Sequence, residues 1–172
     1  MHTTLPVLPA AWTRFIVACA MLVMTGAAAA QQAIAFEGVT PGMSRSDALQ
    51  AVAGTTCYVH SDGRRIDAEI CELPEAGPGD TLFSGTGAKR AFHVRDGRVS
   101  VLSALVSEAA ARKLVDAVAE RLGRFEPFES PSAKRAGKQG VALIWNTPTQ
   151  RVAFDLHPTA SGEFLLMVYP AR

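Results

Sequence analysis

Apolar residues recur at helical spacing most clearly between residues 108 and 122. The members of this pattern are Ala111, Leu114, Val115, Val118 and Leu122. Such spacing places them in one stripe along a helix, where they can be buried together. Ser107 precedes the segment as a favourable N-cap residue, and Gly123 follows it as a residue that commonly ends helices. The pattern therefore predicts a helix over residues 108–122.

A shorter helix is predicted over residues 44–53. The apolar residues on one of its faces are Ala48, Leu49 and Val52. Ser44 is a favourable N-cap, and Asp47 three residues later can complete a capping box. Gly54 then suits a left-handed position just past the helix end.

The first half of the chain also contains short segments in which apolar and polar residues alternate, the pattern of a half-buried strand. Strands are predicted at residues 56–59, 66–71, 81–83, 91–94 and 99–101. Asp96-Gly97 predicts a type I′ hairpin turn, because both central residues of that turn need a positive φ. Alternation places Phe92, Val94, Val99 and Val101 towards the core, with His93 and Arg95 on the opposite side.

The second half predicts three further strands, at residues 141–146, 151–156 and 164–169. In the middle strand Val152, Phe154 and Leu156 face one way, and Arg151, Ala153 and Asp155 face the other. This alternation is typical of an antiparallel meander with one solvated face, and Trp145 is expected in its core. Residues 130–140 are expected to form a basic, flexible loop.

Helix and then strands therefore occur twice, over residues 40–105 and again over residues 106–170. We predict an α+β fold in which two helix-plus-antiparallel-meander units pack as one small domain over residues 31–172. That length suits a single domain with its own core.

The first 30 residues have a different character. Arg14 is the only charged residue before an apolar run, and the segment ends in small residues at Ala28 and Ala30. This combination predicts a cleavable signal peptide over residues 1–30, and the run is too short to span a bilayer. The expected location is therefore the periplasm or the outside of the cell, with no transmembrane segment after cleavage.

Three cysteines occur in the chain, and their positions give them different interpretations. Cys19 lies within the apolar run, so we interpret it as part of the signal peptide; lipid attachment at Cys19 is the alternative. Cys57 and Cys71 remain as an even pair, which predicts a disulfide in an exported protein. The alternative for this pair, a redox or metal site, lacks the Cys-x-x-Cys spacing and further cysteines.

Charge excludes one class of partner. The chain has 17 Lys+Arg and 16 Asp+Glu, and loss of Arg14 with the signal peptide balances them. No basic excess therefore favours nucleic acid. Two local basic groups are candidate interaction surfaces for a protein or envelope component: Lys134, Arg135 and Lys138, and His60, Arg64 and Arg65.

Catalytic and cofactor motifs are not recognisable. His60, His93 and His157 lack the spacing of metal ligands, so no metal is expected. The glycine-rich stretch 84–89 resembles a phosphate loop, but Ala88 and Arg90 occupy positions that require Gly and Ser or Thr. Glutamate pairs such as Glu69 and Glu72 show no sign of opposed environments. No catalytic residue and no cofactor are therefore predicted.

Residues 36–44, Phe-Glu-Gly-Val-Thr-Pro-Gly-Met-Ser, followed by the short helix and Gly54, resemble the opening of the outer-membrane-assembly lipoproteins of the SmpA/OmlA kind. The arrangement of tandem helix-plus-meander units is similar to the β-lactamase-inhibitor-protein fold. The resemblance implies a non-catalytic binding fold, here without a lipid anchor because no cysteine begins the mature chain.

These observations favour an exported, non-catalytic binding or envelope-associated protein, of unknown oligomeric state. Two alternatives remain open. One is a small cell-envelope hydrolase with a carboxylate or histidine site. The other is a small-ligand carrier whose pocket lies on a face of the sheet, lined by residues such as Trp145, Phe154 or Phe164.

Overall fold

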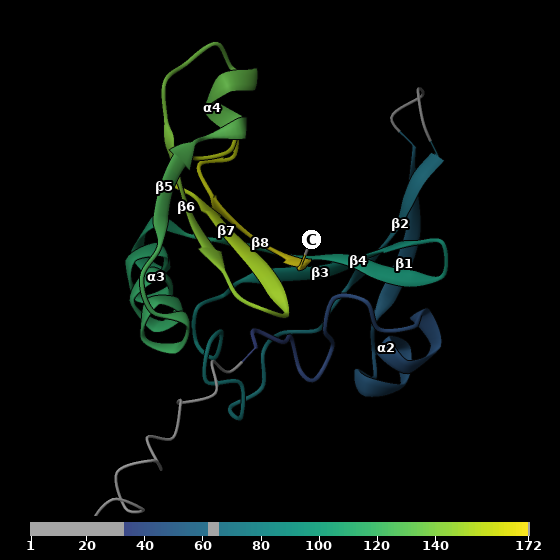
Figure 1. Ribbon diagram of the computed structural model, residues 1–172. Coiled ribbons are helices and arrows are strands. Elements are labelled where there is room, and N and C mark those ends of the chain that lie inside the picture. Colours follow the sequence, from purple (N-terminus) through teal and green to yellow (C-terminus); the bar gives the residue numbers. More distant parts are fainter. Residues whose placement is uncertain (1–32, 62–65, 172) are drawn as a thin grey trace, which may run out of the picture. The chain divides into compact units, whose positions relative to one another are not determined.

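The computed structural model describes residues 33–61 and 66–171. The expected signal peptide, Cys19 and its alternative lipid attachment lie outside the described residues. Gln31–Arg172 forms one compact unit of the chain. All elements discussed below belong to this unit (Figure 1).

An eight-stranded antiparallel sheet dominates this unit, in the order β1-β2-β3-β4-β8-β7-β6-β5. Its strands are β1 (Thr56–Ser61), β2 (Ile66–Glu72), β3 (Lys89–Arg95), β4 (Arg98–Val106), β5 (Glu126–Glu129), β6 (Val141–Asn146), β7 (Gln150–Asp155) and β8 (Phe164–Pro170). The helices are α2 (Arg45–Ala51), α3 (Glu108–Leu122) and α4 (Pro131–Arg135). The expected α+β class is therefore confirmed, with the sheet much larger than the helical part.

Strand order divides the sheet into two groups of four. The strands β1 to β4 are sequential neighbours, and so are β5 to β8. The groups join through β4 and β8, where Leu102 pairs with Val168 and Ala104 with Leu166. One continuous sheet therefore runs from the edge strand β1 to the edge strand β5.

The hydrophobic core lies on one face of this sheet. Side chains from α2, α3, the segment 34–39 and the loop 73–87 meet those of the strands there. Leu114 and Val118 on α3 are fully buried against the sheet, as the helical stripe predicted. Trp145 is buried in the same core, and its indole Nε1 donates to the carbonyl of Gly123 at 3.0 Å. That bond ties the end of α3 to β6.

The short helix α2 begins as the sequence predicted. The Oγ of Ser44 accepts a hydrogen bond from the amide of Asp47 at 3.2 Å. Arg45 then donates to both carboxylate oxygens of Glu69 on β2, at 2.6 and 2.7 Å. This two-bond contact with Arg45 holds the pKa of the Glu69 carboxyl below its ordinary value. At Ser107, by contrast, the side chain makes no capping bond to α3, and the Ser107 carbonyl accepts from the amides of Ala110 and Ala111.

The most deeply buried charge is Arg90 on β3, whose side chain is fully buried. Its guanidinium donates to Asp80 at 2.9 Å, to Glu37 at 2.8 Å and to the carbonyl of Pro74 at 2.7 Å. The guanidinium carbon also lies 5.8 Å from the centre of the Phe83 ring. One side chain therefore fixes both the N-terminal segment and the loop before β3 against the sheet.

The strand expected at residues 81–83 is wrong, because this segment forms a turn. The Oδ1 atom of Asp80 accepts the amides of Leu82 and Phe83, at 2.9 and 3.0 Å. The other carboxylate oxygen of Asp80 binds Arg90. A side chain that satisfies two successive amides favours a turn over a strand ladder, and the apolar Leu82 and Phe83 are buried from that turn.

The Asp96-Gly97 hairpin is confirmed, with φ values of 52° and 72° at these two residues. A bulge then changes the alternation in β4. His93 pairs with Val101 and Val94 with Val99, so one extra residue lies between the two pairs. Val101 therefore leaves the core side on which Val99 is buried, contrary to the expectation that both face the core.

The expected loop at residues 130–140 is also wrong in part, since α4 occupies its first half. The strand β5, which precedes it, was missed. Asp155 was expected on the solvated side, yet it is buried and accepts from the Oγ of Ser130 at 2.6 Å. Leu156, expected to face the core, is 42% exposed beyond the end of β7. The Ser130–Asp155 bond attaches the start of α4 to β7, which sequence alternation alone cannot reveal.

The Cys57–Cys71 disulfide is present, joining directly paired residues of β1 and β2 with a Cα–Cα distance of 4.0 Å. It crosslinks the hairpin at one edge of the sheet. The strand β1 is therefore held to β2 by a covalent bond as well as by its ladder.

Substitution of Asp80 tests the buried ion cluster. We expect Asp80→Ala to lower the free energy of unfolding by about 3–5 kcal/mol, because it leaves the buried Arg90 charge without its best-buried partner. Urea denaturation followed by circular dichroism measures this. Glu37→Gln is the control: the Glu37 side chain is 26% exposed and the amide keeps an acceptor, so its effect is smaller. A loss below about 1 kcal/mol for Asp80→Ala would contradict the role given to the cluster.

Candidate binding face of the sheet

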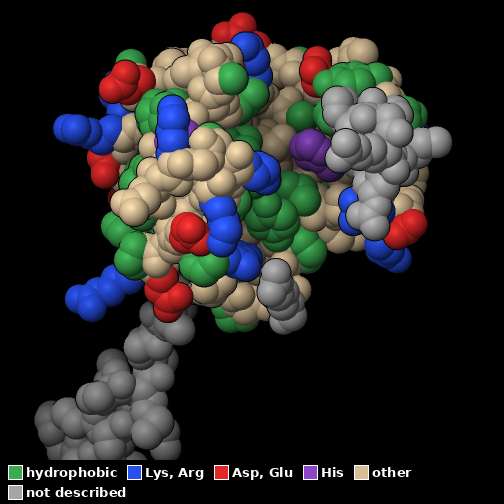
Figure 2. All heavy atoms as spheres, turned by 90° about the horizontal axis from the view of Figure 1, so that it is seen from above, with side chains coloured by type: hydrophobic (Ala, Val, Ile, Leu, Met, Phe, Trp, Pro, Cys, Tyr) green, Lys and Arg blue, Asp and Glu red, His purple; other side chains and the backbone are tan. Residues whose placement is uncertain are grey.

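The face of the sheet opposite the core is the candidate functional site, and we call it the open face. Neither α2 nor α3 covers it, because both contribute to the core on the other side (Figure 1). Figure 2 looks towards this side and shows hydrophobic side chains in a hollow, with lysine and arginine side chains around it. Solvated faces of antiparallel sheets usually carry polar residues, so an apolar hollow here needs an explanation.

The strand registers order these side chains in rows across the sheet. The middle row consists of Ile144, Ala153, Met167 and Ser103 on β6, β7, β8 and β4. The row on one side of it consists of Ala142, Asp155, Leu165 and Leu105. The row on the other side includes the paired residues Arg151 and Tyr169. An apolar centre therefore lies between an arginine–tyrosine pair and a buried aspartate.

A groove of about 840 Å³ follows the part of the open face formed by β4 to β8, and we call it the Arg151 groove. Its floor includes Ala142, Ile144 and Ala153, and its sides include Phe128, Leu165, Met167 and Tyr169. Arg95 and Arg151 supply its cationic groups. The small side chains of Ala142 and Ala153, with larger ones beside them, explain the hollow.

Arg151 and Tyr169 determine the electrostatics of this groove. The Nε of Arg151 is buried and has no hydrogen-bond partner among the described residues. The hydroxyl of Tyr169 donates to the sulfur of Met167 at 2.9 Å, and a thioether is a weak acceptor. Burial raises the pKa of the Tyr169 phenol, while the positive charges of Arg151 and Arg135 act in the opposite direction. Both guanidinium groups therefore act on this end of the groove.

A second hollow of about 620 Å³ adjoins the first, and we call it the His93 hollow. Ser103 and Leu105 line it and are the β4 neighbours of Met167 and Leu165 in the groove. The Nε2 of His93 and the Oγ of Ser103 share a hydrogen bond of 2.9 Å. A serine–histidine pair is one part of a nucleophilic site, which also needs an oriented base and donors for an oxyanion. We therefore interpret the His93–Ser103 pair by itself as polar lining of the His93 hollow.

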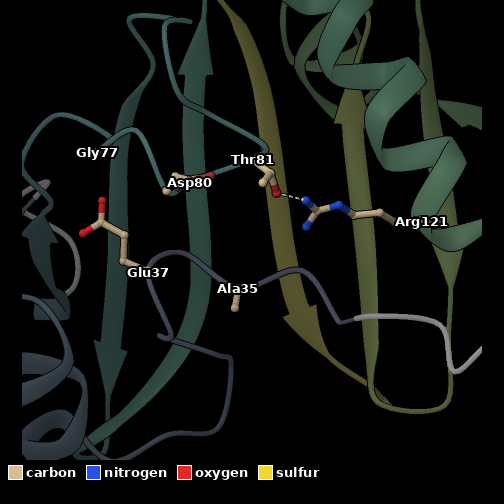
Figure 3. Close-up of a pocket in the computed structure, with 7 residues that line it drawn as sticks. Ala35, Glu37, Gly77, Asp80, Thr81 and Arg121 are labelled. Carbon is tan, nitrogen blue, oxygen red and sulfur yellow. Dashed lines mark hydrogen bonds between the residues drawn. The ribbon is translucent and has the colours of Figure 1, made fainter.

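The third recess, of about 370 Å³, lies beside the N-terminal segment and is drawn in Figure 3. Glu37 and Asp80 at this recess bind Arg90. Arg121 reaches from α3 and donates to the hydroxyl of Thr81 (Figure 3). These polar groups have partners within the fold, so we assign the recess a structural role.

The first predicted basic group is brought together around α4. Lys134 and Arg135 lie in its last turn, and Lys138 follows it; all three are exposed. Lys134 forms an ion pair of 3.0 Å with the exposed Glu129, which reduces its availability to a partner. In the second predicted group, Arg64 and Arg65 lie outside the described residues. His60 is in β1, and its side chain also lies outside the description.

The described histidines do not share a site. His93 lies in the His93 hollow, whereas the amide of His157 donates to Asp155 beyond the end of β7. Among the described residues, one group of potential metal ligands has its atoms within 4.8 Å: Cys57, Glu69 and Cys71. The two cysteines form the disulfide and Glu69 binds Arg45, so these atoms have other roles.

The residues of the Arg151 groove were missed by sequence reasoning. Alternation did place Arg151, Ala153 and Asp155 on the side away from the core, and this was the available signal. It could not show that Met167 and Leu165 would lie beside them, because that contact depends on the pairing of β7 with β8.

Comparisons with family models, curated proteins and solved structures find no match for this chain. None of the helices in the described part of the chain is long and apolar enough to cross a bilayer. The functional argument therefore depends on the geometry of the open face.

Titration of Tyr169 tests the electrostatics of the groove. The chain has two tyrosines, so Tyr58→Phe leaves Tyr169 as the only phenol. We expect its pKa to lie above the ordinary value, and Arg151→Met to raise it further by removing a positive charge that favours the phenolate. Ultraviolet absorbance of tyrosinate measures this, with Arg112→Met on α3 as the charge-matched control. An unchanged or lower pKa in Arg151→Met would contradict the placement of Arg151 beside Tyr169.

Proposed function

We propose that this chain is an exported, non-catalytic binding protein that recognises a protein or envelope component with the open face of its sheet. The observation that carries the proposal is the mainly apolar middle row of the open face, which lies beside Arg151 and Tyr169 and is left uncovered by α2 and α3. An apolar hollow with a few charged groups is the usual composition of a ligand site.

The disulfide supports a location outside the cytosol. Structural disulfides persist in oxidising compartments and are rare in the cytosol. The Cys57–Cys71 bond is therefore compatible with a periplasmic or extracellular protein, as the predicted signal peptide requires.

We also propose that each half of the sheet, with the helix before it, is one helix-plus-meander unit. The strand order supports this, because α2 precedes the neighbours β1 to β4 and α3 precedes the neighbours β5 to β8. This arrangement is what the resemblance to the β-lactamase-inhibitor-protein fold implies. The resemblance to SmpA/OmlA-type lipoproteins concerns the entry into α2, where Ser44 caps the helix.

The small-ligand carrier is the second candidate function. The Arg151 groove favours it, because about 840 Å³ falls within the range of about 300–1,000 Å³ typical of small-molecule sites. The expected lining by Trp145, Phe154 and Phe164 is not seen in this groove. Trp145 and Phe154 are fully buried on the core side, and Phe164 packs against that core.

Site-specific photo-crosslinking tests the proposed binding face. A photoreactive residue replaces Ser103 or Leu165 on the open face, and in a control it replaces Arg112 on the exposed side of α3. We expect crosslinked products in intact envelopes from the first two positions and not from the control, because the partner contacts the open face. Products from position 112 alone, with none from positions 103 and 165, would contradict the proposal.

A further inference from the structure

The floor of the Arg151 groove is narrower than an open sheet surface would be. Ala142 and Ile144 lie in the groove, on the side away from the core, yet they are only 2% and 6% exposed. Neighbouring groups therefore cover them almost completely. Such a slot admits a single chain of atoms more readily than the broad surface of a folded protein.

The length of the apolar lining also suits an extended chain. It crosses five neighbouring strands, from Phe128 on β5 through Ile144, Ala153 and Met167 to Val101 on β4. With neighbouring strands about 4.8 Å apart, the lining extends over roughly 19 Å. Because Arg151 is on β7, the middle strand of the five, about 10 Å of this lining extends to either side of it, enough to bury part of an unbranched alkyl chain.

Beside the middle of this lining, on β7 and β8, lie two groups that offer hydrogen-bond donors. Arg151 lines the groove, and its guanidinium has several donors and no acceptor. Its Nε is buried without a partner in the described part of the chain, as are the Nε of Arg90 and the Nε2 of Gln150. Tyr169 lies beside Arg151, with its hydroxyl on a weak sulfur acceptor. A carboxylate supplies what both groups lack, because it accepts several hydrogen bonds and carries the complementary charge.

The acidic residue of the groove does not supply this carboxylate. Asp155 lies in the same strand as Arg151 but four residues away, which corresponds to about 13 Å along β7. Its Oδ1 accepts from the Oγ of Ser130 and from the amide of His157, at 2.6 and 2.9 Å. The groove therefore keeps a positively charged side at Arg151 and an apolar middle.

We propose that the Arg151 groove binds an alkyl carboxylate, with the carboxylate on Arg151 and the alkyl chain along Ala153, Ile144 and Met167. This inference rests on the proposed function, since it names the ligand chemistry of the same open face. Tyr169 donates a second hydrogen bond to the carboxylate when its hydroxyl turns from Met167.

Isothermal titration of the purified protein with dodecanoate, below its micelle concentration, tests the proposal. We expect binding of one dodecanoate per chain. Dodecanol should bind about tenfold more weakly or worse, because it lacks the charge that meets Arg151. Dodecyltrimethylammonium, with the opposite charge, and acetate, without the chain, should show no binding at the same concentrations.

Three variants locate the site. Arg151→Met keeps an apolar stem and removes the donors, so dodecanoate should bind about tenfold more weakly while dodecanol is unaffected. Ala153→Phe fills the floor and should abolish binding of both probes. Arg112→Met removes one arginine from the exposed side of α3 and should bind dodecanoate as the unmodified protein does. Circular dichroism and thermal unfolding establish that each variant is folded.

Equal affinity for dodecanoate and dodecanol, unchanged binding by folded Arg151→Met, or no binding of dodecanoate would each overturn the proposal. The photo-crosslinking experiment distinguishes failure of the alkyl carboxylate proposal from failure of the proposed binding function. Crosslinks from positions 103 and 165 without dodecanoate binding would leave the binding face in place and refute the ligand class.

Discussion

A buried guanidinium holds two irregular segments against one face of this sheet. Arg90 lies in the core and needs charged partners there, because an unpaired buried charge costs several kcal/mol. Glu37 and Asp80 provide them, and each belongs to a segment without regular structure of its own. Both segments are therefore held against the same face as α2 and α3, and their apolar residues Phe36 and Phe83 complete the core.

The consequence is a sheet whose two faces differ in kind. The core face is covered by α2, α3 and two ordered segments, while the open face, to which the start of α4 is attached through Asp155, retains an apolar row, two hollows and the Arg151 guanidinium. A bound carboxylate would pair with the Arg151 charge, so the proposed ligand would also stabilise the folded protein.

Much of the fold could be predicted from the sequence because its signals are local. The periodicity of α3, the cap at Ser44 and the Asp-Gly turn each depend on neighbouring residues, and all three are confirmed. The failures have non-local causes. Asp80 makes residues 81–83 a turn while it binds Arg90, and Ser130 reaches Asp155 across 25 positions. The candidate site could not be predicted as a whole, since it depends on the pairing of β8 with both β4 and β7.

The central claim is that the face left open by the Arg90 arrangement is the one that binds ligand. Methyl NMR spectra of the protein with and without dodecanoate test it most directly. The account predicts shifts of the methyl resonances of Ile144, Leu165 and Met167 on the open face. The methyl resonances of Leu114 and Val118, which α3 contributes to the core, should be unchanged. Shifts centred on the core methyl groups of α3, or no shifts at all, would contradict this claim.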